Sequence, residues 1–322
     1  MKLSIIIPAY NAVNYLRRCV ESLSNQDLPF NCYEAIVIND GSTDNSIEIL
    51  DLLCSKYSFL RYVTTENCGL SLARNRGVLE ASGEYLLFLD SDDSICPNVL
   101  GSIYREMASN QLDMMLMNYL FLSTDDASLD IPFKMDANSR MVVGGKDFLM
   151  SDHYPPMVWI YAYKRSFLID NKLEMIPIWH EDEEFTPRAI CLADRIKYYP
   201  LLFYRYYQNE GSYMMHYQES NVLYLIAAMS SLAVFRRSYS FDYELNRYFD
   251  DHIATTLMQL FKNSIKRGYR NQKEIILKMK EANLLPLHPR KPHFYFCLFN
   301  FSPFLFEIYY RVIKRKFRKN NF

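Results

Sequence analysis

The sequence lacks the cysteine pairs that build disulfide frameworks and structural zinc sites. Its seven cysteines are an odd number, and no two of them form a C-x-x-C motif. This pattern excludes the common zinc motifs and favours a reducing compartment. We also expect no signal peptide, because the run Leu3–Ile7 between Lys2 and Pro8 is too short for its apolar core. We therefore expect a cytoplasmic protein.

Glycine-rich phosphate loops are absent too. The chain has nine glycines in 322 residues and contains neither G-x-G-x-x-G nor G-x-x-x-x-G-K-[ST]. A nucleotide site in this chain would therefore have to offset phosphate charge by other means. Half of the residues are hydrophobic and no low-complexity tract is present, so the composition predicts a chain that is folded throughout.

The net charge of −1 conceals a strongly basic C-terminal segment. Residues 262–322 hold 15 Lys and Arg against 3 Asp and Glu, so this segment carries +12 and the remainder −13. Residues 294–310 are mostly aromatic or apolar, but Pro303 and Glu307 interrupt them, which makes the run short for a membrane-spanning helix. Six basic residues follow: Arg311, Lys314, Arg315, Lys316, Arg318 and Lys319.

An aromatic stretch joined to a basic cluster favours a segment that lies on an anionic membrane surface. The alternative is a last helix that docks on the core and leaves a solvated basic end. Nucleic acid is not an expected partner, because no nucleic-acid-binding motif accompanies the basic residues.

Strand and helix patterns alternate along the first part of the chain. Apolar runs typical of strands occur at 3–7, 35–40, 61–64, 85–89 and 114–121. Apolar residues at helical spacing follow the first four runs. This alternation predicts an α/β fold with a mainly parallel sheet flanked by helices.

The second part of the chain has a different pattern. Residues 122–160 are polar and irregular, with a turn expected at Gly144 and Gly145. Residues 198–212 are expected to form an aromatic strand that leads to a polar loop. A helical pattern then runs from about 218 to 283. We therefore expect an α/β domain at 1–215 and a helical C-terminal extension at 216–322.

Three carboxylates follow the strand predicted at 85–89. Asp90, Asp92 and Asp93 would lie at its carboxyl end, which is where open α/β sheets bind ligands. Their mutual repulsion is costly unless a cation offsets it. We interpret the cluster as a site for Mg²⁺ or Mn²⁺ that also holds a nucleotide diphosphate. The alternative is that these acids only end the strand and cap the following helix.

Two further charged features have both a functional and a structural interpretation. Arg74 can supply a guanidinium group for a phosphate or a base carbonyl, although a lone helical arginine is by default exposed to solvent. Four consecutive acids occur at 181–184. On composition alone they indicate the first turn of a helix, where acidic side chains complement the helix dipole without any function.

Five short motifs occur in order along residues 3–215. They are PAYN at 8–11, NDGSTDNS at 39–46, GLSLARNRG at 69–77, FLDSDD at 88–93 and EDEEF at 181–185. Together, in this order and spacing, they resemble the successive motifs of the family 2 inverting glycosyltransferases, which have the GT-A fold. Any one of them alone is a weak signal, whereas all five together are specific.

The resemblance implies a donor-binding role for eight residues: Pro8, Ala9, Tyr10, Asn11, Asp40, Arg74, Asp90 and Ser91. Pro8, Ala9 and Tyr10 would line the base pocket, and Asp40 would accept a hydrogen bond from the nucleobase imide. Arg74 would lie near the base or the diphosphate, and Asp90 would contact the ribose.

The same resemblance implies that Asp92 binds the metal ion and that Asp182 is the general base, with Glu181 as the less favoured candidate. The family often has a further contact to the metal or diphosphate after the base. In this chain the loop at 204–216 offers Tyr206, Ser212 and His216, and the sequence does not choose among them.

The observations predict an inverting, metal-dependent glycosyltransferase of the hexosyl-transfer type. It would move a sugar from a nucleotide diphosphate donor, a UDP-sugar, to a hydroxyl of a glycan or lipid-linked acceptor in cell-surface polysaccharide synthesis, at the cytoplasmic face of the membrane. One alternative is a nucleotidyltransferase that makes activated sugars, but residues 8–14 lack its usual glycine-rich entry loop. Another is a non-catalytic carbohydrate-binding protein, which would not need Asp182.

Overall fold

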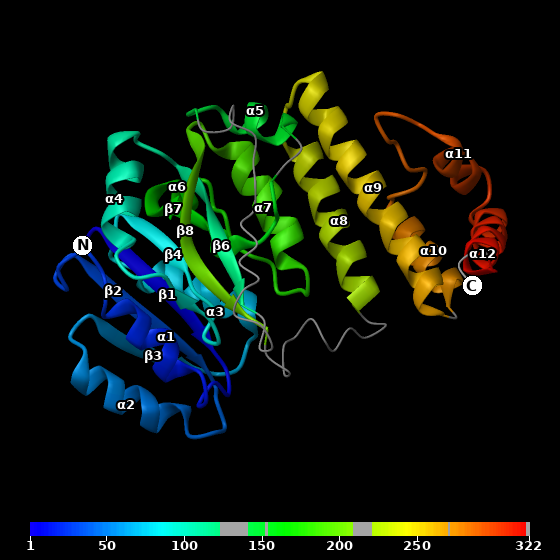
Figure 1. The fold of residues 1–322 in the computed structure, drawn as a ribbon. Helices are drawn as coiled ribbons and strands as arrows, with labels where there is room; N and C mark the ends of the chain where they lie inside the picture. The colour runs from blue at the N-terminus through cyan, green and yellow to red at the C-terminus, as the bar shows by residue number, and fades with distance from the viewer. Residues whose placement is uncertain (123–140, 152–153, 209–220, 270, 320–322) are drawn as a thin grey trace. The chain divides into compact units, whose positions relative to one another are not determined.

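The computed structural model describes residues 1–122, 141–151, 154–208, 221–269 and 271–319 (Figure 1). The chain forms two compact units. The first comprises Met1–Pro177 and Phe185–Met215, and the second comprises Ile178–Glu184 and His216–Phe322. The domain boundary predicted between residues 215 and 216 stays a prediction, because compactness alone does not test whether each part folds independently.

The described part of the first unit contains an eight-stranded sheet. Its strands are β1 (Leu3–Ala9), β2 (Tyr33–Asp40), β3 (Leu60–Thr65), β4 (Tyr85–Phe88), β5 (Ser94–Ile95), β6 (Met114–Leu122), β7 (Tyr161–Lys164) and β8 (Ile196–Tyr207). Their order across the sheet is β3-β2-β1-β4-β7-β6-β8-β5. The strands β3, β2, β1 and β4 are parallel to one another, and β6 is parallel to β8. The pairings of β4 with β7, β7 with β6 and β8 with β5 are antiparallel.

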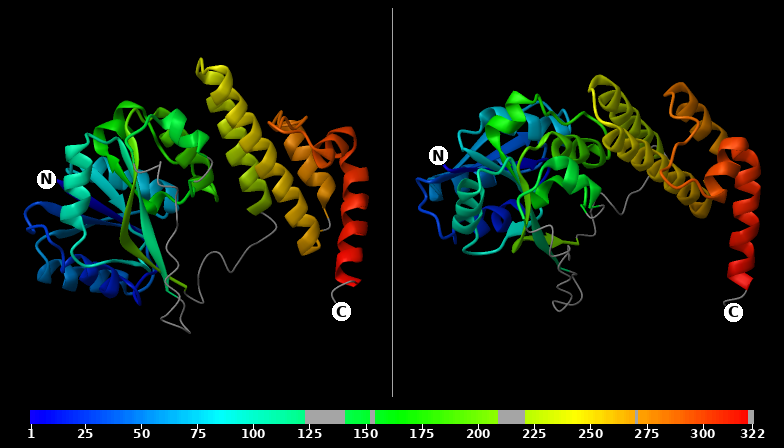
Figure 2. Two further views of the ribbon diagram at one scale, coloured as in Figure 1. Left: turned by 45° about the horizontal axis from the view of Figure 1, so that its top comes forward. Right: turned by 90° about the horizontal axis from the view of Figure 1, so that it is seen from above.

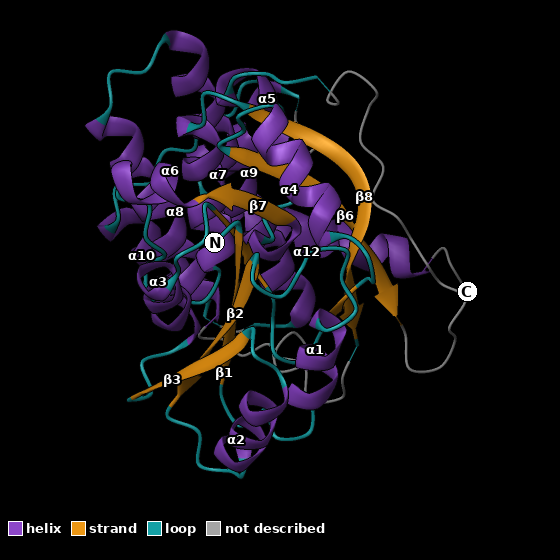
Figure 3. Ribbon diagram, turned by 90° about the vertical axis from the view of Figure 1, so that its left-hand side faces the viewer, coloured by secondary structure: helices purple, strands orange, loops and turns teal. Residues whose placement is uncertain are grey.

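Helices connect and flank these strands, which confirms the predicted α/β fold class (Figure 3). They are α1 (Leu16–Leu23), α2 (Ser46–Lys56), α3 (Leu70–Glu80), α4 (Leu100–Ser109), α5 (Gly145–Met150), α6 (Arg165–Asp170) and α7 (Glu181–Leu192), with a short 3₁₀ helix, η2 (Val158–Ile160). Helix α7 begins in the short segment of the second unit and continues in the first.

The centre of the sheet is buried on both faces, as the apolar runs predicted. Every residue of β1 and of β2 is buried, which is typical of strands covered by helices on both sides. Helix α3 packs closely on these strands at Gly77, because a β-carbon there would overlap the side chain of Ile6. Arg74 lies one turn before Gly77 and is also buried, so the close packing of α3 fixes the position of Arg74.

Several boundaries differ from the sequence-based expectations. The helix expected after the acidic cluster begins at Leu100 and is preceded by the short strand β5, which pairs with residues 204 and 205 of β8. A pairing across more than 100 residues leaves no signal in local periodicity. The glycine pair expected to form a turn instead starts a helix, because Gly144 is the N-cap and Gly145 the first residue of α5. Residues 123–140 of the predicted irregular region lie outside the described residues.

The described part of the second unit is helical. It contains α8 (Asn221–Ser238), α9 (Tyr243–Arg267), α10 (Gln272–Glu281), α11 (Phe294–Phe301) and α12 (Pro303–Lys319). Helices α8 and α9, yellow-green to orange in Figure 2, lie side by side in both views. The side chain of Asp242 caps α9 by accepting a hydrogen bond of 2.9 Å from the amide of Leu245, and Gly268 ends the helix with a positive φ of 80°.

An aromatic cluster joins α11 and α12 to α9. The ring centroids of Phe261 and Phe299 are 5.0 Å apart, and Phe306 lies 6.0 Å from Phe261 and 5.5 Å from Phe299. All three side chains are buried, so the C-terminal helices are packed on the unit through these rings. None of the helices in the described ranges is both long and apolar enough to cross a membrane.

Candidate functional site

Four loops of the first unit begin at the same edge of the sheet. They follow β1, β2, β3 and β4, which are parallel neighbours, so their carboxyl ends point in the same direction. This edge is the usual ligand site of open α/β sheets. All predicted donor and metal residues lie on these strands, in these loops or in α3, whereas Asp182 belongs to the second unit.

The loop after β1 is joined to the loop after β2. Pro8 and Ala9 are buried at the end of β1, and Tyr10 is exposed directly after them. The side-chain oxygen of Asn11 accepts hydrogen bonds from the amide and the hydroxyl of Thr43, at 2.8 and 3.3 Å. Asn11 therefore joins the two loops, and the exposed ring of Tyr10 can stack on a planar group.

Asp40 anchors the entry to α3. Its buried carboxylate accepts hydrogen bonds from the backbone amides of Cys68 and Gly69, at 2.9 and 2.8 Å. The chain turns directly after Asp40 at Gly41, where φ is 68° and a β-carbon would lie 2.8 Å from the amide nitrogen of Asn67. A nucleobase imide that reached Asp40 would therefore donate to a carboxylate that already accepts hydrogen bonds from the loop before α3.

Arg74 is buried rather than exposed, so the alternative of a solvated helical arginine does not apply. Its side chain is 2% exposed and its Nη2 donates to Oδ1 of Asp90 at 2.8 Å. A buried guanidinium paired with a carboxylate is stable only with good geometry. The pair connects α3 to the loop after β4 that contains Asp90, Asp92 and Asp93, here called the acidic loop. It also brings two of the predicted donor residues into direct contact.

Asp93 is the most buried member of the acidic cluster. Its side chain is 1% exposed, and it accepts hydrogen bonds from the hydroxyl of Tyr204 at 2.7 Å and from the amide of Tyr207 at 2.8 Å. Burial, and then the charges of Asp90 and Asp92, raise the pKa of Asp93 to about 8. The repulsion expected from the sequence is therefore present in the fold, and positive charge placed beside this loop would be stabilised.

A second arginine near the acidic loop was not predicted. Arg18 of α1 donates from Nη2 to the carbonyl oxygen of Asp92, and its guanidinium lies 3.7 Å from the centre of the Tyr207 ring. Its neighbour Arg17 is exposed. Because the two adjacent arginines look alike in the sequence, no local signal identifies Arg18 as the one that reaches the site.

The contacts made by β8 were also missed. The hydroxyl of Tyr204 donates to Asp93 and accepts from the amide of Asp90 at 3.2 Å, and its ring stacks 4.2 Å from that of Trp159. Tyr206, predicted as a possible contact to the metal or diphosphate, stacks 5.7 Å from Trp159. The other two candidates of that loop, Ser212 and His216, lie outside the described residues.

The ligand chemistry of the acidic loop fits a hard divalent cation. Its side chains offer carboxylate oxygens, which Mg²⁺ and Mn²⁺ prefer. Among the residues that the structure describes, no group of three or more His, Cys, Asp or Glu side chains could hold a metal ion. An ion at Asp92 would therefore need further oxygen ligands, and the phosphate groups of a bound nucleotide have the right chemistry.

The four acids at the start of α7 have distinct surroundings. Glu181 and Glu184 are buried, whereas Asp182 and Glu183 are partly exposed. Glu184 accepts a hydrogen bond of 2.7 Å from the hydroxyl of Ser231 in α8, and burial raises the pKa of Glu183. The four acidic side chains are thus not all exposed to solvent, and at least Glu184 has a structural role.

The N-terminal part of the chain is a glycosyltransferase family 2 domain. Residues 4–130 match the model of this family, Glycosyl transferase family 2. The chain is also 34% identical over 227 residues to the uncharacterized glycosyltransferase YibD of Escherichia coli K12, a match that covers 68% of this chain and 65% of that protein. This chain therefore spans slightly less than two thirds of that relative.

Two solved structures share the fold. Residues 1–349 of Staphylococcus aureus TarS, in complex with UDP-GlcNAc, superpose with a TM-score of 0.75 at 21% identity, over 99% of this chain and 92% of that one. The mannosyltransferase PcManGT of Pyrobaculum calidifontis, in complex with GDP-Man and Mn²⁺, gives a TM-score of 0.55 at 14% identity, over 97% and 86%. The expected GT-A-like architecture with C-terminal helices is confirmed.

The contacts of Tyr204 predict that its hydroxyl stabilises the fold. Tyr204→Phe removes a donor from Asp93 and an acceptor from the amide of Asp90, so the free energy of unfolding should fall by about 1–3 kcal/mol in urea denaturation. Tyr119→Phe is the matched control, because Tyr119 also contacts Trp159, with ring centroids 5.1 Å apart, and its loss should cost less than about 0.5 kcal/mol. Equal losses in the two variants would contradict the role of the Tyr204 hydroxyl.

Proposed function

We propose that the protein is an inverting, metal-dependent hexosyltransferase that moves a sugar from a UDP-sugar to a hydroxyl of a glycan or lipid-linked acceptor in cell-surface polysaccharide synthesis. The observation that carries the proposal is the acidic loop at the carboxyl edge of the sheet, in a chain whose N-terminal part is a glycosyltransferase family 2 domain. TarS and PcManGT, which share the fold, are described with UDP-GlcNAc and with GDP-Man and Mn²⁺. These complexes support a nucleotide sugar as donor.

The donor nucleotide would bind along the edge formed by the first four parallel strands. The exposed ring of Tyr10, with Pro8 and Ala9 behind it, suits a nucleobase. Asp40 would accept from the base imide, and Asn11 would hold the loop in place. The remaining donor residues of the proposal lie in α3 and the acidic loop: Arg74, Asp90 and Ser91.

The leaving group would be bound beside the acidic loop. Loss of a nucleoside diphosphate builds negative charge on its phosphate oxygens, which needs fixed positive charge near them. Asp92 would hold Mg²⁺ or Mn²⁺, and the ion supplies this charge without proton transfer when it is bound. Asp90 would contact the ribose while its bond to Arg74 keeps its carboxylate oriented.

Asp182 would act as the general base. The acceptor hydroxyl is a poor nucleophile at neutral pH and needs a carboxylate within hydrogen-bond reach. The oxygen of the acceptor hydroxyl would form a bond to the anomeric carbon of the donor sugar while the bond from that carbon to the diphosphate oxygen breaks. The proton of the hydroxyl would pass to Asp182. Attack from the face opposite the leaving group inverts the anomeric configuration.

The first test measures metal-dependent nucleotide binding. Mn²⁺ should tighten UDP binding to the wild-type chain by at least about tenfold, since the ion bridges carboxylate and phosphate oxygens, and Asp92→Asn should lose this gain. Isothermal titration calorimetry with Mn²⁺ or with EDTA provides the measurement. Asp194→Asn, an exposed acid outside the loop, is the control and should behave as wild type. No effect of Mn²⁺ on the wild type would exclude the metal proposal.

The second test separates chemistry from binding. Asp182→Asn should lower the turnover of UDP-sugars by about 10²- to 10⁴-fold, the usual contribution of a general base, and should leave UDP binding unchanged. Glu181→Gln is the comparison and should keep most of the activity. Turnover of Asp182→Asn equal to wild type would remove the base assignment. Release of pyrophosphate from UTP and a sugar phosphate would instead favour the nucleotidyltransferase alternative.

We also propose that the C-terminal helices hold the protein on the cytoplasmic face of an anionic membrane. Phe304, Leu305, Ile308 and Val312 of α12 are all exposed, and their spacing puts them on adjoining faces of one helix. Phe301, just before this helix, is 81% exposed. Such an apolar stripe, followed in the sequence by the basic cluster, has the composition of an interfacial helix.

The membrane proposal predicts that exposed apolar residues of α12 govern vesicle binding. The double variant Phe304→Ser and Ile308→Ser should bind vesicles containing phosphatidylglycerol at least about tenfold more weakly in sedimentation assays, because each buried apolar side chain contributes about 1.5–3 kcal/mol. Leu52→Ser and Leu79→Ser, at exposed positions of the first unit, should leave binding unchanged. These variants are cleaner than truncation after Pro289, which would also remove Phe299 and Phe306. Undiminished binding of the double variant would contradict the membrane proposal.

A further inference from the structure

We propose that Arg18 is a positioning residue for metal-dependent binding of the donor diphosphate, and that it acts by holding the acidic loop against the end of β8. This role rests on the proposed function, because it assigns a further residue to the same donor site. Arg18 lies in α1 and belongs to none of the five motifs, so the resemblance implies no role for it.

Helix α1 contacts the main chain of the acidic loop and of the strand that follows it. The guanidinium group of Arg18 donates to the carbonyl oxygen of Asp92, and the hydroxyl of Ser22 accepts a hydrogen bond of 3.2 Å from the amide of Ile95 in β5. Arg18 and Ser22 are four residues apart in α1, so they lie on the same face of the helix. This face therefore fixes the path of the main chain from the acidic loop into β5.

The bond from Arg18 does not use the carboxylate oxygens of the loop. It goes to the main-chain oxygen of Asp92, so it does not itself occupy an oxygen of the kind that a divalent cation would bind. Groups that hold a metal ligand in place without binding the ion commonly contribute about 10- to 100-fold to metal affinity. Arg18 would contribute in this way, because it orients the peptide group that carries the proposed metal ligand.

The same guanidinium group also joins the acidic loop to β8. It lies 3.7 Å from the centre of the Tyr207 ring, and Tyr207 is the last residue of that strand. The amide of Tyr207 donates to Asp93 at 2.8 Å, and its hydroxyl accepts from the hydroxyl of Ser94 at 3.4 Å. Tyr207 thus contacts this part of the chain both directly and through Arg18.

Stability alone does not explain the position of Arg18. Its Nε atom is buried and has no hydrogen-bond partner among the residues that the structure describes. An unpaired buried donor lowers the free energy of unfolding, so the contacts with Asp92 and Tyr207 are kept at a cost. Costs of this kind are expected where a side chain serves binding.

The contacts of Arg18 require an arginine. A planar guanidinium group can lie with its face on an aromatic ring while its edge donates to a carbonyl oxygen. The ammonium group of lysine is a compact charge and cannot do both. Arg18→Lys therefore keeps the positive charge near the loop but loses the link to Tyr207, which separates a positioning role from a purely electrostatic one.

Loss of this link should weaken only the metal-dependent part of nucleotide binding. Without Arg18 the acidic loop would have to become ordered when the ion binds, and that ordering opposes binding. Stacking of the base on Tyr10 does not involve the ion, so UDP binding in the absence of metal should be unchanged.

The test measures the UDP affinity of the full chain by isothermal titration calorimetry, once with Mn²⁺ and once with EDTA. Arg18→Met and Arg18→Lys should each weaken binding about tenfold with Mn²⁺ and leave it unchanged with EDTA. Tyr207→Leu should have the same effect, whereas Tyr207→Phe keeps the ring and should bind as wild type. The double variant Arg18→Met and Tyr207→Leu should bind no more weakly than either single variant, because both changes remove the same contact.

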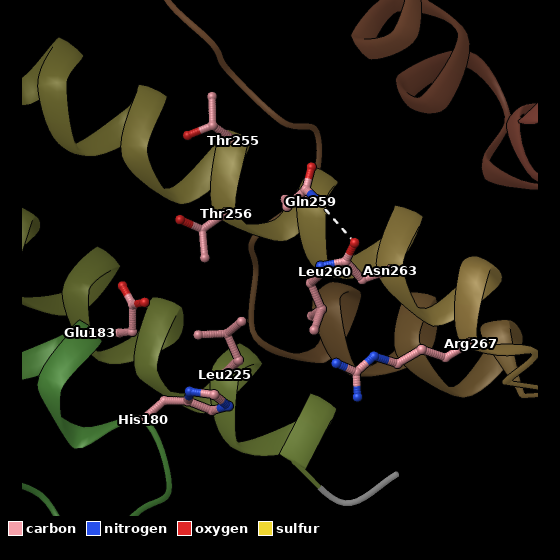
Figure 4. A pocket seen from close by; sticks show the side chains of 9 residues that line it. All are labelled: His180, Glu183, Leu225, Thr255, Thr256, Gln259, Leu260, Asn263 and Arg267. Atoms are coloured by element: carbon pink, nitrogen blue, oxygen red, sulfur yellow. Dashed lines mark hydrogen bonds between the residues drawn. The ribbon is translucent and has the colours of Figure 1, made fainter. Parts of the chain in front are cut away.

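Two other arginines serve as controls. Arg17→Met removes the exposed neighbour of Arg18 in α1. Arg267→Met removes an arginine of the second unit, which together with Glu183 lines a cavity of about 430 Å³ formed by residues of α7, α8 and α9 (Figure 4). Both control variants should bind UDP as wild type, with and without Mn²⁺.

Three results would overturn the positioning role of Arg18. They are a Mn²⁺-dependent affinity of Arg18→Met equal to wild type, full recovery in Arg18→Lys, and equal weakening with Mn²⁺ and with EDTA, which would indicate a general loss of structure. If Arg18→Met does not fold, the comparison of Tyr207→Leu with Tyr207→Phe decides, and equal affinities of these two would overturn the role. A wild-type chain whose UDP affinity does not respond to Mn²⁺ would instead refute the proposed metal-dependent transfer.

Discussion

The repulsion among Asp90, Asp92 and Asp93 is the constraint on which the rest of the site depends. Three carboxylates in one loop, one of them almost fully buried, are tolerated only where other parts of the chain supply hydrogen bonds and positive charge. Helix α3 supplies Arg74 to the first of these acids, and β8 supplies Tyr204 to the last. The acidic loop thus contacts two elements that are far apart in the sequence, α3 and β8.

The same constraint links the fold to the proposed chemistry. Burial is the main cause that raises the pKa of Asp93 to about 8, and the charges of Asp90 and Asp92 add to it. Those two charges would also attract a divalent cation. A site of this kind does not need a glycine-rich loop to offset a diphosphate. This gives a physical reason why a nucleotide-binding sheet can lack the usual phosphate motifs.

The first turn of α7 shows how a helix distinguishes similar residues. Four successive acids point about 100° apart around the axis, so each meets different surroundings. Glu184 is held by Ser231 of α8, and Glu183 lines the cavity. On composition the four acids are equivalent, and any of them could simply complement the helix dipole. In the fold, Glu183 and Glu184 have specific neighbours, so complementing the dipole does not account for the whole run.

The sequence by itself determined the strand–helix alternation, the acidic cluster after β4 and the family, because apolar periodicity and short motifs are properties of neighbouring residues. Only the tertiary structure decided that Arg74 is buried against Asp90, that Arg18 rather than Arg17 reaches the acidic loop, and that β8 closes over Asp93. These contacts join residues that are 16 to 114 positions apart. Which distant side chain becomes a neighbour depends on the order of the strands, and that order exists only once the sheet has assembled.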